Sequence, residues 1–172
     1  MIPISLLLVG SHRMEIGALG GVLGGMPNLA IIGTASTAGE ALSVAELHPP
    51  DVAVIDTLLG SDDAFELTDR LIRLHPDVGA VVLIDGEDAG LALRAVLAGA
   101  AAVVVKPVAV DILADLIWAV ADGETHIPPR LLTGVIRVLR AGIPADGWTE
   151  RLASEAVVGG CRQPEISLKA LD

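Results

Sequence analysis

Short apolar runs alternate along the chain with segments whose apolar residues recur at helical spacing. The runs predict five buried strands, at Ile4–Val9, Leu29–Gly33, Val52–Ile55, Ala80–Ile84 and Ala102–Val105. The segments between and after them predict five helices, at 14–26, from Thr37 to just before Pro49, at 64–75, at 88–98 and at 110–121. Because parallel strands need long crossover connections, which are usually helices, this alternation predicts an α/β fold with an open parallel sheet covered on both faces.

A sixth helical segment follows the alternating region. Pro128-Pro129 can open it, and apolar residues recur along one face from Leu131 to Leu139. From Gly142 onward the pattern fades, because prolines and glycines interrupt it. We therefore expect a domain over residues 1–124, a linker helix over 125–142 and an irregular tail over 143–172.

Composition narrows the class of protein. At 172 residues the chain suits one domain with a tail, and a core of 52% hydrophobic but only 2% aromatic residues must be built from Ala, Val, Leu and Ile. The net charge of −11 repels a phosphate backbone, so we expect no direct binding of nucleic acid by this chain. One cysteine, no secretory leader pattern and no apolar run of about 18 residues predict a cytoplasmic protein with no membrane partner.

Polar residues gather where the expected strands end. Gly10-Ser11-His12, Asp56, Asp85 and Lys106 follow or close four of the strands, and the carboxyl ends of parallel strands share one edge, where ligands bind. Asp56 alone is compatible with an ordinary turn cap. Lys106 is more informative, because it is one of only two lysines among eleven basic residues, and its compact ammonium can pair with a carboxylate or a phosphoryl oxygen.

Six motifs in register resemble the receiver domain of LuxR/NarL-type two-component response regulators. They are "ISLLLVGSHRM", "TASTAGEAL", "PPDVAVIDTLLG", "HPDVGAVVLI", "AGAAAVVVKP" and "VADGETHIPPRLL". The resemblance implies a flavodoxin-like (βα)5 sandwich with strand order 2-1-3-4-5 and a non-enzymatic signalling role. It also implies that Asp56 is the phosphoacceptor, that Lys106 pairs with the phosphate, and that the partner is a sensor histidine kinase.

The chain departs from the family at the positions that bind metal and transmit the signal. Gly10 and Ser11 stand where the family has the two acidic residues that hold Mg²⁺ with the phosphoacceptor, and Gly60 replaces a usual proline. Ile84 replaces the Thr or Ser switch residue, and Val103 replaces the aromatic switch. Because phosphoryl transfer needs a cation held by several oxygens, we expect no cofactor, weak or absent Mg²⁺ binding and impaired phosphorylation of Asp56.

Other interpretations stay open for the rim, the edge of the expected sheet where the carboxyl ends of the strands meet. Five nearby acids could reach a cation or could simply be charges at helix N-termini: Asp62, Asp63, Asp85, Glu87 and Asp88. Gly10-Ser11 could belong, with Lys106, to a pocket that senses a small ligand or an anion, or could merely mark the loss of metal binding. An enzyme is a weaker alternative, because no second activated group accompanies Asp56.

Two of the expected helices are more apolar than packing on a sheet requires. The helix at 88–98 is apolar nearly all round, and Ile112 and Trp118 lie at the margins of the stripe on the helix at 110–121. We therefore expect a homodimer or a protein contact through Leu91, Val96, Ile112 and Trp118. DNA contact would require an output domain, and residues 143–172 show no complete helix-turn-helix.

Overall fold

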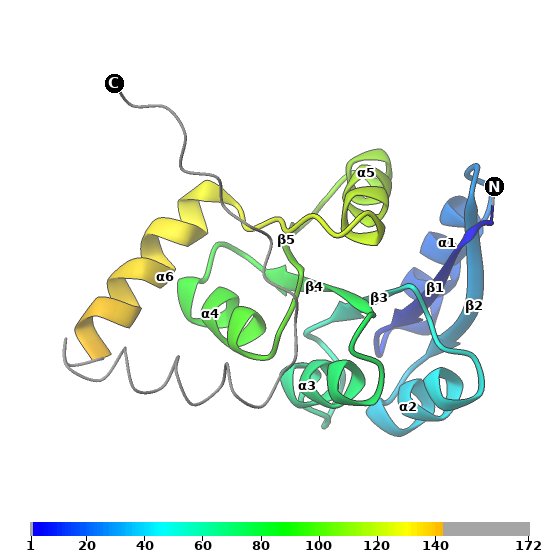
Figure 1. Ribbon diagram of the computed structural model, residues 1–172, viewed down its shortest axis with the longest axis horizontal. Helices are drawn as coiled ribbons and strands as arrows, with labels where there is room; N and C mark the ends of the chain where they lie inside the picture. Colours follow the sequence, from blue (N-terminus) through cyan, green and yellow to red (C-terminus); the bar gives the residue numbers. More distant parts are fainter. Residues whose placement is uncertain (1, 143–172) are drawn as a thin grey trace, which may run out of the picture. The chain divides into compact units, whose positions relative to one another are not determined.

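Five strands and six helices make up the part of the chain that the structure, a computed structural model, describes, residues 2–142 (Figure 1). The strands are β1 (Ile4–Val9), β2 (Leu29–Ala35), β3 (Val52–Asp56), β4 (Gly79–Asp85) and β5 (Ala102–Lys106). The helices are α1 (Arg13–Leu23), α2 (Ala38–Leu47), α3 (Ala64–Leu74), α4 (Ala89–Leu97), α5 (Val110–Ala121) and α6 (Pro129–Gly142). The expected tail over 143–172 lies outside the described residues.

The strands form one parallel sheet in the order β2-β1-β3-β4-β5. This confirms the predicted fold class and strand order. Helices α1 and α5 lie on one side of the sheet and α2, α3 and α4 on the other, as Figure 1 shows. The carboxyl ends of the strands therefore meet at a single edge, between the two layers of helices.

Strand alternation explains why the sheet has two hydrophobic cores. In β1, Leu6 and Leu8 point into the core shared with α1 and α5, whereas Leu7 and Val9 point into the core shared with α2 and α3. All four side chains are fully buried. A strand buried on both faces must be continuously apolar, which is the pattern of Ile4–Val9.

Local capping sets the start of three helices. The Thr37 hydroxyl accepts a hydrogen bond from the Glu40 N–H (3.2 Å) at the start of α2. Asp63 and Asp88 accept backbone N–H groups at the starts of α3 and α4. These side chains satisfy donors that have no partner inside the helix, so the helix starts were predictable within one residue.

Among the five strands and the first five helices, two boundaries differ from the sequence prediction by more than one residue. The first helix ends at Leu23 rather than at residue 26, because the last turn closes there: the N–H of Gly24 donates to the carbonyl oxygen of Gly20 (2.9 Å), and the N–H of Gly25 donates to that of Val22 (3.2 Å). The second strand continues to Ala35 instead of stopping at Gly33, because Thr34 and Ala35 pair with the end of β1. The pairing of neighbouring strands, rather than local composition, decides where β2 ends.

Candidate functional site

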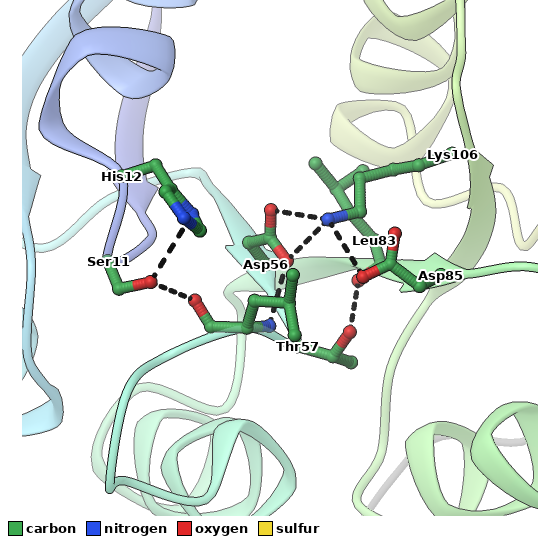
Figure 2. Close-up of polar contacts among 8 residues, drawn as sticks. Ser11, His12, Asp56, Thr57, Leu83, Asp85 and Lys106 are labelled. Atoms are coloured by element: carbon green, nitrogen blue, oxygen red, sulfur yellow. Dashed lines mark hydrogen bonds and ion pairs between the residues drawn. The ribbon is translucent and has the colours of Figure 1, made fainter.

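Asp56 and Lys106 form the centre of the site at the carboxyl edge of the sheet (Figure 2). Asp56 ends β3 and Lys106 ends β5, so the lysine side chain reaches across the intervening strand β4. Its Nζ lies 2.9 Å from Oδ1 and 2.8 Å from Oδ2 of Asp56. The N–H of Leu58 donates a further hydrogen bond of 2.8 Å to Oδ1. The Asp56 carboxylate is therefore fully engaged, and the residue is only 7% exposed.

A second carboxylate approaches the same ammonium. Asp85, which pairs with Lys106 in the β4–β5 register, places Oδ2 3.4 Å from Nζ. Burial alone would lower the pKa of Lys106, but the hydrogen bonds and the negative charge of Asp56, with a smaller contribution from Asp85, raise the pKa above its ordinary value of 10.5. Lys106 therefore carries its positive charge throughout the physiological pH range.

The loop after β1 brings neutral groups to the other side of Asp56. The Ser11 hydroxyl donates a hydrogen bond of 2.6 Å to the carbonyl oxygen of Leu58, and the Ser11 N–H donates to the same oxygen at 3.3 Å. The Ser11 oxygen also lies 3.5 Å from Nδ1 of His12. Ser11 thus ties the loop after β1 to the loop after β3, and it adds no negative charge beside Asp56.

Gly10 leaves little space for a larger residue. A β-carbon built there would lie 2.8 Å from Cδ1 of Ile16 and 3.3 Å from Cβ of Asp56. An acidic side chain at this position would require the Ile16 side chain to move. The packing of α1 against the strand end is therefore adapted to glycine.

The loop after β3 has a conformation that the usual proline could not adopt. Gly60 has φ +67°, whereas the proline ring fixes φ near −65°. The departure at this position is thus a change in backbone shape as well as in side chain.

The five acids considered above as cation ligands have partners within the protein. Asp63 and Asp88 cap helices, Asp62 accepts the N–H of Ala38 (2.7 Å), Asp85 faces Lys106, and Glu87 pairs with Arg130 (2.9 Å). Within residues 2–142, the structure groups no three Cys, His, Asp or Glu residues as metal ligands. The interpretation as helix-terminal charge fits Asp63 and Asp88.

Hydrogen bonds and ion pairs stabilise the Asp63 carboxylate further. Its desolvation would raise its pKa, but the N–H groups of Phe65 and Glu66 and the charge of Arg94 together lower the pKa below 3.8. The Arg94 guanidinium lies 2.6 Å from Asp63 and 4.2 Å from the centre of the Phe65 ring. This contact joins α3 to α4.

The two expected switch positions are buried apolar residues. Ile84, the penultimate residue of β4, and Val103 of β5 have no exposed surface. Neither lines the pocket beside Asp56, whereas Leu83 and Asp85 on either side of Ile84 do.

A pocket of about 490 Å³ lies next to the Asp56–Lys106 pair. Gly10 and Lys106 line it, as the sequence suggested, together with residues of α1 and α5. Ser11 does not line it, which corrects the expected pocket of Gly10, Ser11 and Lys106. The reason is that the Ser11 hydroxyl turns to the Leu58 carbonyl oxygen instead.

The four expected interface residues differ in exposure. Leu91, Val96 and Trp118 are half-buried, and Ile112 is 53% exposed. Trp118 packs against the core shared by α1 and α5, so much of its surface already has an intramolecular partner.

Helix α6 supplies contacts that sequence reasoning missed. Residues up to Ile136 belong to one compact unit, in which Leu131 and Val135 are buried. A β-carbon at Gly134 would lie 2.5 Å from Cβ of Ala89, and Arg130 forms the ion pair with Glu87. The start of α6 therefore covers the start of α4, and the unusually apolar sequence of α4 was the signal of such a cover.

A parallel five-stranded sheet in this order, with an aspartate and a lysine paired at its carboxyl edge, is the arrangement expected of a signalling receiver. The family model "Response regulator receiver domain" matches residues 6–117. The chain belongs to this family, and it is a receiver domain of two-component signalling.

Relatives of known function lie in the LuxR/NarL-type group. The chain is 29% identical over 152 residues to the DNA-binding transcriptional activator DevR/DosR of Mycobacterium tuberculosis, covering 86% of this chain and 70% of that protein. It is 28% identical over 152 residues to the transcriptional regulatory protein LiaR of Bacillus subtilis, covering 86% and 72%. The match to response regulator GacA of Pseudomonas viridiflava covers only 60% of that protein, so the activity of a whole regulator does not transfer directly.

Solved structures agree on the fold. A LuxR-family response regulator from Aurantimonas sp. SI85-9A1 superimposes with a TM-score of 0.71 at 23% identity, covering 79% of this chain and 99% of that one. The receiver domain of the putative response regulator NarL from Mycobacterium tuberculosis gives 0.67 at 17% identity, covering 72% and 100%. Separately, none of the helices among residues 2–142 has the length and apolar character needed to span a bilayer.

Proposed function

We propose that this chain is an atypical receiver in which Mg²⁺-dependent phosphorylation of Asp56 is impaired and which acts mainly through protein contacts. One observation carries the proposal. The Lys106 ammonium contacts both oxygens of Asp56, while the loop after β1 offers a neutral hydroxyl that is already donated to Leu58. The Asp56 carboxylate thus already has a cationic partner within the protein.

The chemistry of phosphoryl transfer explains why this arrangement matters. Mg²⁺ needs several oxygen ligands in near-octahedral geometry, and it neutralises the charge that develops on the transferred group. A cation arriving at Asp56 would meet the Lys106 ammonium within 3 Å of each carboxylate oxygen and would find no carboxylate at Gly10 or Ser11. Repulsion and the small number of ligands both lower its affinity.

The altered switch positions support the same proposal. Ile84 has no hydroxyl that could follow a phosphoryl oxygen, and Val103 has no ring that could change rotamer. A phosphoryl group on Asp56 would therefore lack the hydroxyl and the aromatic ring that the resemblance implies for transmitting the signal.

The experiment is titration of the full chain with Mg²⁺ in the presence of beryllofluoride or acetyl phosphate, followed by amide NMR and intact mass. The wild type should show no saturable change at Asp56 up to about 10 mM Mg²⁺. Ser11→Asp returns a carboxylate to the loop and should bring Mg²⁺ binding into the millimolar range. Ser43→Asp adds the same charge on α2, where Ser43 bonds to Gly39, and should not. Stable modification of wild-type Asp56 at millimolar Mg²⁺ would overturn the proposal.

We further propose a homodimer or another protein partner on the face that includes Ile112 and Trp118, with a sensor histidine kinase as an upstream partner. Exposure of Ile112 supports this, although α6 reduces the share of α4 that is available. Sedimentation of the full chain should show self-association at protein concentrations on the order of tens of micromolar. A strict monomer at those concentrations would count against self-association.

The alternative of an anion sensor receives less support from the site. Gly10 and Lys106 line the pocket, but Lys106 is shared between two carboxylates, so an incoming anion would compete with both.

A further inference from the structure

The pocket beside Lys106 combines two apolar walls with an excess of negative charge. Ile16 and Leu19 of α1 form one wall. Val108, which precedes α5, and Val110 and Leu113 near the start of α5 form the other. Its volume of about 490 Å³ lies in the range of ordinary small-molecule sites.

The charges around this pocket favour one sign of ligand. Three carboxylates line it, from Glu15, Asp56 and Asp85, against the ammonium of Lys106 and the imidazole of His12. Lys106 lies 2.8 Å from Asp56 and 3.4 Å from Asp85, so its charge is already balanced. Glu15 is exposed at the start of α1 and adds a further negative charge beside the apolar wall. A positively charged group gains from this arrangement, whereas an anion is repelled by it.

We propose that the pocket binds small organic amines with an apolar body, the ammonium group near Glu15 and Asp85 and the body between Leu19 and Val110. The inference rests on the proposed function in one respect, that Asp56 stays unphosphorylated and paired with Lys106. It goes beyond that function, because it gives the site a ligand of defined chemistry.

The test uses the full chain, without Mg²⁺ or a phosphodonor, and three probes followed by calorimetry and amide NMR. Phenethylamine carries both features, hydrocinnamate has a similar body with a carboxylate, and ethylamine has the charge alone. Phenethylamine should bind with a Kd of about 1 mM or tighter, at least about tenfold more tightly than either other probe. Its affinity should fall as salt is raised, because Glu15 and Asp85 are exposed to solvent.

Variants then locate the binding. Glu15→Gln should weaken phenethylamine about three- to tenfold, and Leu19→Ala should weaken it by a similar factor through lost apolar contact. Glu46→Gln removes the same charge from an exposed position on α2 and should leave binding unchanged.

Three outcomes would overturn the inference: no saturable binding of phenethylamine, equal or tighter binding of hydrocinnamate, or an effect of Glu15→Gln no larger than that of Glu46→Gln. Phosphorylation is measured separately. Modification of Asp56 with amine binding intact would overturn the proposed function alone, and absence of both would overturn the amine site alone.

Discussion

The two halves of the rim around Asp56 are built from different chemistry. On the β3–β5 half, Asp56, Asp85 and Lys106 form charged contacts of 2.8 to 3.4 Å across three strands. On the β1 half, Gly10 packs against Ile16, and Ser11 makes a neutral hydrogen bond to Leu58. The first half holds the paired aspartate and lysine, and the second half has no acidic side chain at Gly10 or Ser11.

This difference indicates that the lysine–aspartate pair has a structural role independent of phosphorylation. A carboxylate that is 7% exposed needs a partner whether or not it reacts, because an uncompensated buried charge is costly. The β1 loop has no such requirement, since its polar groups bond to backbone. The paired charges can thus stabilise the fold whether or not the β1 loop carries acids.

The largest loss of stability is expected from removing Lys106, which holds the charged half together. Lys106→Met leaves Asp56 with the Leu58 N–H as its remaining close donor and should cost about 2–4 kcal/mol in the free energy of unfolding, measured with urea. Adding Asp56→Asn should recover much of the loss, because it removes the stranded charge. As a control, Arg73→Met breaks the exposed Arg73–Asp69 pair and should cost less than about 1 kcal/mol. Equal costs for the two single variants would contradict a structural role for Lys106.

A smaller loss of stability is expected from adding a side chain at Gly10, in the β1 half. Gly10→Ala should destabilise the protein by about 1–2 kcal/mol, because its β-carbon meets Cδ1 of Ile16. Ile16→Val deletes that atom, so the two changes together should cost less than the sum of the single variants in a double-mutant cycle. Gly17→Ala, where a β-carbon meets nothing within 4 Å in helix α1, should be neutral or stabilising by up to about 1 kcal/mol. Strict additivity of Gly10→Ala and Ile16→Val would show that Gly10 is not limited by Ile16.

The smallest effect is a loss of stability at high pH that belongs to the charged half. The pKa of Lys106 is raised above 10.5 in the folded state, so its contribution is complete below about pH 10.5 and is lost as pH rises through the higher folded value. The loss should not exceed about 1.4 kcal/mol for each pH unit, since one proton is involved. The chain has no tyrosine, which leaves few other groups that titrate there. Between about pH 9 and about pH 11.5, the free energy of unfolding in urea should fall more steeply with pH for the wild type than for Lys106→Met. Parallel pH profiles for the two proteins would refute a contribution of Lys106 titration to stability.

Much of the fold could be predicted from the sequence because its signals are local. Continuous apolar runs mark strands buried on both faces, and Thr37, Asp63 and Asp88 announce helices by capping N–H groups two or three residues away. Asp56 and Lys106 were identifiable from their places at strand ends and from the rarity of lysine. Each of these signals depends on residues close together in the chain.

The tertiary structure decided which groups those residues contact. Lys106 reaches Asp56 only because β4 alone separates their strands, and Asp85 joins them through the β4–β5 register. Ser11 turns away from the pocket because the loop after β3, with Gly60 at φ +67°, brings the Leu58 carbonyl oxygen within 2.6 Å. Likewise, the start of α6 covers the start of α4 because Gly134 permits close approach to Ala89. Periodicity and capping are properties of neighbouring residues, so the sequence alone determined the elements and the chemical groups at the rim. Register and loop geometry arise only when distant segments pack together, so the folded structure decided which of those groups are paired.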